Sequence, residues 1–112
     1  MTISKDNAPF HTWGDKCGAW TLVQSESTLV KEERMPPATS ERLHYHVKTE
    51  QFFYILEGRA SFFLEDREIL LLQGDGIKVP LGQPHKIVNR SLEELRFLVV
   101  SFHWEEGDRV DM

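Results

Sequence analysis

Three histidines in two short segments are the residues of this chain whose types and spacing could do chemistry. His44 and His46 flank one tyrosine in the segment HYH, and His85 lies in GQPHKIVN. Side chains alternate between the two faces of a β-strand, so His44 and His46 would project from the same face. Imidazole is a common ligand of divalent transition metals, and a histidine from a nearby strand would complete the cluster. We expect a metal site here in preference to three core histidines bonded to neighbouring carbonyls.

The segments around these histidines resemble the two-part motif of the cupin superfamily. In the first part, the His-x-His and closing glycine positions are filled by His44, His46 and Gly58. In the second part, every fixed position is filled, by Gly74, Pro80, Gly82, His85 and Asn89. The 15 residues between the two parts are a spacing that small single-domain cupins use. The resemblance covers roughly residues 34–102.

One position departs from the cupin pattern. Most metal-binding cupins carry a glutamate seven residues before the closing glycine of the first part, and Gln51 stands there, next to Glu50. Period-two alternation places Gln51 on the same face as Phe53, and Glu50 on the opposite face. The resemblance thus implies a metal bound by His44, His46, His85 and Gln51, with Glu50 as the alternative to Gln51. A neutral amide in place of a carboxylate would weaken the affinity and strengthen the Lewis acidity of the metal.

Short strands separated by Gly and Pro turns make up the rest of the chain. We expect strands at residues 19–24, 27–35, 41–46, 50–57, 59–64, 68–72, 77–79, 85–89 and 95–104. Such a pattern predicts an all-β fold, a small closed β-barrel or double-stranded β-helix (jelly roll) with little helix. Residues 1–18 are expected to form an N-terminal arm, residues 19–104 the cupin β-barrel, and residues 105–112 an acidic C-terminal tail.

Composition excludes several classes of partner. The 112 residues suffice for one domain, and the net charge of −5 comes without a basic cluster, which argues against nucleic acid. No apolar run approaches the ~20 residues that span a bilayer, so we expect no membrane partner. The first residues do not resemble a secretory signal, and Cys17 has no intrachain partner. We expect a cytoplasmic protein.

Two of the predicted strands, residues 51–56 and 95–102, are apolar on both faces. A strand wetted on one side would alternate apolar and polar residues, so both faces must be covered. So small a barrel offers little to cover the outer face besides the N-terminal arm. We therefore expect a homodimer formed through a sheet face.

Aromatic side chains near the histidines could wall a small-molecule pocket. We expect Phe53 and Phe62, or Phe63 in place of Phe62, to line it, and His103 to lie at its mouth. Glu41 and Arg42 are expected to be solvated charges at the rim.

The resemblance implies one divalent transition metal (Fe, Mn, Ni, Cu or Zn) and chemistry on a small organic molecule. Open metal positions would suit an enol, a diketone or a hydroxy-carbonyl compound, in a dioxygenase-like or isomerase-like reaction. The alternative is a non-catalytic module that binds a small molecule or a sugar. A third reading is a metal-free structural barrel. The fold hosts enzymes and binding modules alike, so the sequence leaves open whether the chain is an enzyme, and no catalytic side chain is identified beyond the metal site.

Overall fold

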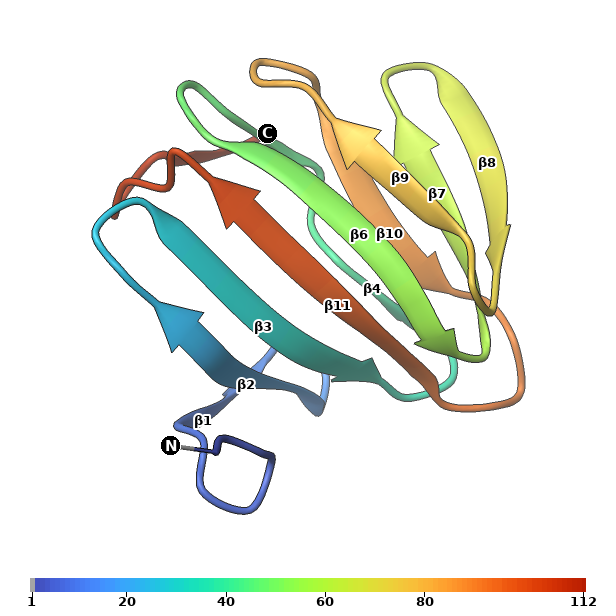
Figure 1. The fold of residues 1–112 in the computed structure, drawn as a ribbon. Helices are drawn as coiled ribbons and strands as arrows, with labels where there is room; N and C mark the ends of the chain where they lie inside the picture. The colour runs from blue at the N-terminus through green and yellow to red at the C-terminus, as the bar shows by residue number, and fades with distance from the viewer. Residues whose placement is uncertain (1) are drawn as a thin grey trace.

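Two β-sheets packed face to face form the protein (Figure 1). A computed structural model describes residues 2–112, and these residues form twelve strands and no helix. The expected all-β jelly roll is confirmed, although the two sheets are not joined into a strictly closed barrel. Within the described part of the chain, no helix is long and apolar enough to cross a membrane.

The first sheet has the strand order β1-β2-β3-β11-β6-β9. Its members are β1 (Phe10–Trp13), β2 (Cys17–Gln24), β3 (Thr28–Met35), β11 (Leu95–Phe102), β6 (Glu50–Glu57) and β9 (Gly76–Val79). The second sheet has the order β12-β5-β10-β7-β8, with β4 also paired to β10. Its members are β12 (Arg109–Asp111), β5 (His44–His46), β10 (His85–Asn89), β7 (Arg59–Leu64), β8 (Arg67–Leu72) and β4 (Thr39–Ser40).

Strand β11 shows how the sequence determines which face is buried. Every second residue, from Leu95 to Ser101, points into the barrel and is buried, whereas the residues between them are more exposed. Strand β11 pairs with β3 on one side and with β6 on the other, and the residues of β3 and β6 opposite its inward-facing residues also face the interior. The largest fully buried apolar side chains come from both sheets: Met35, Ile55, Phe62, Ile87, Leu95 and Phe97. Burying each contributes roughly 1.5–3 kcal/mol of transfer free energy.

Gly58 makes the tight turn between β6 and β7 possible. Its φ of +85° lies in the left-handed region, and a Cβ at this position would stand 2.7 Å from the carbonyl oxygen of Glu94. Only glycine fits both conditions without moving the backbone. The turn in turn fixes where β6 ends and hence the register of Gln51.

The structure differs from the sequence-based boundaries at both ends. Strand β1 lies inside the expected N-terminal arm and pairs with β2, so this segment extends the first sheet. Strand β12 lies inside the expected acidic tail and pairs with β5, where Arg109 is opposite His46. All of β12 and nearly all of β1 is exposed. Exposed strands do not require alternating apolar residues, so neither strand has the sequence pattern by which the other strands were predicted. Their pairing depends on neighbours that are distant in sequence.

Candidate metal centre

Strands β5 and β10 bring the three histidines together. His44 and His85 stand directly opposite each other in the pairing of these strands, and His46 follows on the same face of β5. One nitrogen from each of the three rings lies within 4.8 Å of the others. The grouping expected from the sequence is therefore present, on adjacent strands of the second sheet.

Backbone carbonyls fix the protonation of two of these rings. His44 Nδ1 lies 2.7 Å from the carbonyl oxygen of Arg42, and His85 Nδ1 lies 2.9 Å from that of Gln83. A carbonyl can only accept, so each Nδ1 carries the proton and donates it, which leaves a lone pair on Nε2. Hydrogen bonds of this kind orient metal-binding histidines in proteins.

Burial keeps all three imidazoles neutral. It lowers the pKa of His44 to about 3 and that of His85 to about 4, and it also lowers the pKa of His46. His46 Nε2 is buried and has no hydrogen-bond partner among residues 2–112. Neutral imidazoles are the form that binds a metal, and an unpartnered buried nitrogen is costly unless a ligand satisfies it.

Gln51 faces the histidines and Glu50 does not. The Gln51 Oε1 atom lies 3.1 Å from His85 Nε2, and Gln51 Nε2 donates to the Ser101 hydroxyl at 3.1 Å. Glu50 forms an ion pair with Lys78 at 3.4 Å, away from the interior. Because His85 Nε2 bears a lone pair, Oε1 and Nε2 are two acceptors in contact. A cation bound by both atoms would remove this repulsion. Rotating the amide, so that its NH₂ group faces His85, would also remove it. The four side chains therefore fit a divalent metal.

A cavity of about 490 Å³ opens beside the histidines. Its wall is formed by residues of both sheets, including Trp13, Phe53, Val99 and Trp104. Charged and titratable side chains also line it: His11, Lys31, Glu33, Glu41, Arg42, His44, His46 and Arg109. The volume is that of a site for a small organic molecule.

Only one of the three expected pocket residues lines this cavity. Phe53 does so, but Phe62 is completely buried behind the site, where its ring stacks on His85 with centroids 6.1 Å apart. His103 is exposed at the end of β11 and is not part of the lining, whereas its neighbour Trp104 is. Alternation places Phe62 inside the barrel but does not reveal that other side chains lie between it and the cavity.

Glu41 is an interior residue, which corrects its expected place among the solvated rim charges. Its side chain is 12% exposed and accepts a hydrogen bond from the Ile87 backbone at 3.3 Å. The carboxylate also lies 3.6 Å from the Arg109 guanidinium and 3.9 Å from His44 Nδ1. Burial, reinforced by the negative charge of Glu33, raises the pKa of Glu41 to about 8. The expectation for Arg42 is partly corrected too, because this residue lines the cavity.

Asp108 fastens the loop that follows His46. Its carboxylate accepts hydrogen bonds from the backbone N–H groups of Val47, Lys48 and Thr49 at 3.1, 2.9 and 2.9 Å, and from the Thr49 hydroxyl at 2.8 Å. Sequence reasoning missed Asp108, Arg109 and Glu33. The first two lie about 60 residues after the strand they contact, and no short motif marks them.

Known proteins are similar to this chain in sequence and in fold. The sequence model described as "Cupin domain" matches residues 31–101, which is more than half of the chain, and the protein belongs to the cupin family. An uncharacterized protein from Methanocaldococcus jannaschii is 35% identical over 71 residues, covering 63% of this chain and 57% of its own length. An oxalate-binding protein from Thermotoga maritima is 28% identical over 78 residues, covering 70% of this chain and 64% of its own. The matching segment thus spans less than two thirds of either relative.

Solved structures extend the similarity over nearly the whole fold. A predicted oxalate decarboxylase from Thermotoga maritima has a TM-score of 0.86 at 22% identity, covering 93% of this chain and 100% of its own. The polyketide cyclase RemF from Streptomyces resistomycificus has a TM-score of 0.84 at 22% identity, covering 100% of this chain and 84% of its own. At these identities the likeness establishes the fold alone.

Proposed function

We propose that this cupin binds one divalent transition metal through His44, His46 and His85, with Gln51 as the fourth ligand. The observation that carries the proposal is the convergence of three neutral imidazoles, two of them with Nδ1 held by carbonyls, on one point beside a cavity. The bound metal would act as a Lewis acid toward a small molecule. Iron, manganese, nickel, copper and zinc all accept such ligands.

Isomerase-like chemistry on a small hydroxy-carbonyl or diketone compound is the reaction type that we favour. The carboxyl group of Glu33 in the cavity wall could move a proton between two carbon atoms, which is the step that isomerisation requires. A non-catalytic binding module is the second candidate, supported by the name of the oxalate-binding relative. The two differ in whether a bound compound is altered.

Metal content is the decisive test of the site. Elemental analysis of protein purified without an affinity tag should find close to one metal ion per chain, and the His44→Ala/His85→Ala double variant should have lost it. The His103→Ala variant, which changes an exposed histidine outside the cavity, is the matched control and should retain the metal. Failure of the wild-type protein to hold or take up any of the five metals would refute the proposal.

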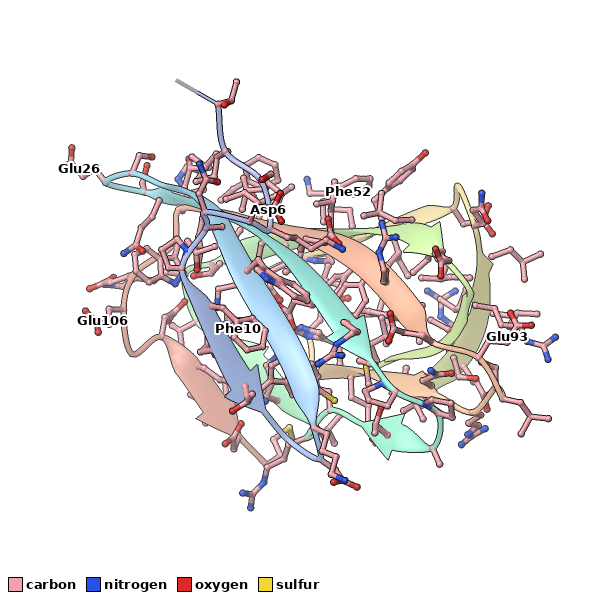
Figure 2. All side chains as sticks on the ribbon, turned by 90° about the horizontal axis from the view of Figure 1, so that it is seen from below. Asp6, Phe10, Glu26, Phe52, Glu93 and Glu106 are labelled. Atoms are coloured by element: carbon pink, nitrogen blue, oxygen red, sulfur yellow. The ribbon has the colours of Figure 1, made fainter. Side chains whose placement is uncertain are left out.

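The outer face of the first sheet supports the expected homodimer. Phe52 projects from this face (Figure 2), next to Val100 on β11, and Tyr54 stands beside Leu98. Tyr54 and Phe102 remain 38% and 42% exposed, so residues 2–112 leave this apolar surface partly uncovered. We propose that a second copy covers it. Size-exclusion chromatography with light scattering should give twice the mass of 13.1 kDa, and a monomer would contradict this.

A further inference from the structure

Glu33 is a carboxyl group on the inner face of the first sheet. It stands between Ala19 of β2 and Phe97 of β11, each only 1% exposed, in a register that points all three side chains into the barrel. Its carboxyl lines the cavity that also contains His44 and His46. A charged residue in the middle of an inward-facing row calls for an explanation, because burying it costs free energy.

Fold stabilisation does not supply that explanation. Within residues 2–112 the Glu33 carboxyl forms no hydrogen bond or ion pair, and the influences on it are burial, the fields of Lys31 and Arg109, and its repulsion with Glu41. Glu41, the other carboxyl in the cavity, is by contrast bound to the Ile87 backbone and lies beside Arg109 and His44. Glu41 is thus committed to structural contacts, whereas Glu33 is free to contact a ligand.

The proton affinity of Glu33 suits transfer at neutral pH. Burial raises its pKa to about 7, against the opposing effect of Lys31 and Arg109. Both protonation states are then populated near neutral pH, which is the condition under which a general acid–base group works best. The other titratable and charged groups in the cavity wall are His11, Lys31, Glu41, Arg42, His44, His46 and Arg109.

We propose that Glu33 is the residue that exchanges a proton with a hydroxy-carbonyl compound held at the three histidines. This inference rests on the proposed function and adds the group that does the proton transfer. The Glu33 carboxylate takes a proton from the carbon that bears the hydroxyl. The electron pair of that C–H bond forms a C=C bond, and the carbonyl π pair moves to the oxygen, which gives an enediolate. The Glu33 carboxylic acid then returns a proton to the same carbon, which regenerates the compound, or to the former carbonyl carbon, in which case the hydroxyl proton passes to the neighbouring enediolate oxygen and the hydroxyl carbon becomes the new carbonyl. No oxidant or reductant is needed.

Hydrogen–deuterium exchange tests this step directly. Hydroxyacetone is incubated in D₂O with Zn²⁺-loaded protein, and loss of its CH₂OH proton signal is followed by ¹H NMR. The rate should fall about 100-fold in Glu33→Gln, in line with the usual contribution of a general base. Glu33→Asp should retain part of the rate. The matched control is Glu26→Gln, which makes the same change at an exposed loop position and should leave the rate unchanged.

Two further measurements separate this inference from the metal site itself. Titration calorimetry should give the same Zn²⁺ affinity for Glu33→Gln as for the wild type. In metal-free protein labelled with ¹³C at the glutamate carboxyl groups, one NMR signal should titrate near pH 7 and be missing in Glu33→Gln.

The outcomes distinguish the two proposals. If the wild type binds none of the five metals, the proposed function and this inference are refuted together. If the wild type binds Zn²⁺ but does not exchange hydroxyacetone, or if Glu33→Gln exchanges it as fast as the wild type, only the role of Glu33 falls. A Glu33 signal that titrates at the ordinary carboxyl pH would likewise overturn that role.

Discussion

The interior of this barrel has two differently lined ends, built from the same strands. On β6, Gln51 lies at the polar end and Ile55 at the apolar end; on β11, Ser101 and Phe97 stand opposite them. On β10, His85 belongs to the polar end, whereas Ile87 is packed in the core. Within a few residues along each strand, the interior side chains therefore change from hydrocarbon to polar groups, among them the metal-binding ones.

This contrast indicates that stability and chemistry are located in different layers of one core. The apolar end contributes burial of hydrocarbon, and the polar end carries neutral imidazoles and carboxyl groups whose desolvation opposes folding. Groups of the second kind are kept at a cost in stability when they have a ligand to bind. Substitutions at the apolar end should therefore lower mainly the stability of the fold, whereas substitutions at the polar end should change mainly the binding of the metal.

The largest effect on stability is expected at the apolar end. Leu95 is completely buried, and Leu95→Ala should lower the free energy of unfolding by about 3 kcal/mol through lost burial and a residual cavity. Urea denaturation measures this change, and Zn²⁺ affinity should stay as in the wild type. Leu92→Ala, at a side chain that is 94% exposed, is the control. A large loss of metal affinity in Leu95→Ala would show that the two ends are not separable.

A smaller loss should follow from releasing the loop at the polar end. Asp108→Ala removes the acceptor of four hydrogen bonds, and a hydrogen bond to a charged group contributes roughly 1.5–3 kcal/mol net of the exchange with water. Because the loop is partly exposed, we expect a net loss of about 2 kcal/mol and a weaker affinity for Zn²⁺. Asp108→Asn, which keeps one acceptor oxygen, should recover part of both. Unchanged metal affinity would mean that the loop does not position His46.

Alkaline pH should weaken the metal-free protein through the carboxyl groups of the polar end. Burial raises the pKa of Glu33 to about 7 and that of Glu41 to about 8, so the folded state holds their protons after the unfolded state has lost them. Their contribution to stability is therefore full below the unfolded pKa of 4.5 and is lost as the pH rises through 7 and 8. Burial lowers the pKa values of His44, His46 and His85 from 6.5, so these groups act in the opposite direction and raise the stability until the unfolded imidazoles have lost their protons, at about pH 7.5.

The expected slope is at most about 1.4 kcal/mol per pH unit for each carboxyl group. Urea denaturation at pH 6.5, 7.5 and 8.5 measures it as the difference in stability between the wild type and the Glu33→Gln/Glu41→Gln double variant, because the histidine contribution cancels in that difference. A difference that stays constant from pH 6.5 to pH 8.5 would contradict the assigned proton affinities.

The smallest effect concerns the fourth ligand. Gln51→Glu replaces the amide next to His85 with a carboxylate, which should tighten Zn²⁺ binding about tenfold because it offsets the charge of the metal. Calorimetry measures the affinity, and Glu50→Gln is the matched control on the outer face and should have no effect. An effect of Glu50→Gln in place of Gln51→Glu would identify Glu50 as the ligand.

Local spacing predicts part of the histidine cluster, and the resemblance to the two-part motif adds His85. Period-two alternation places His44 and His46 on one face and distinguishes Gln51 from Glu50, and the structure shows both arrangements. The all-β jelly roll also followed from short strands between turn residues, and its family from the two-part motif.

The charged lining could not be predicted in the same way. Glu41 precedes the short strand β5 and looked solvated because nothing local reveals that Arg109, 68 residues later, comes beside it. Glu33 left a faint signal, since Lys31 and Glu33 share a face with the buried Leu29 and Met35. Two polar residues between two apolar residues on one face of a strand can contact solvent at a sheet end or can line a cavity. Only the assembled sheet shows which of the two applies.

The pairing of β5 has a consequence for how the protein is made. This three-residue strand is held by β10 on one side and by β12 on the other, so its partners follow it by about 40 and 65 residues. During synthesis β5 must therefore wait for β12 to leave the ribosome before it is fixed on both sides. We expect metal capture to follow the synthesis of β12, which makes this strand a control point for loading the metal.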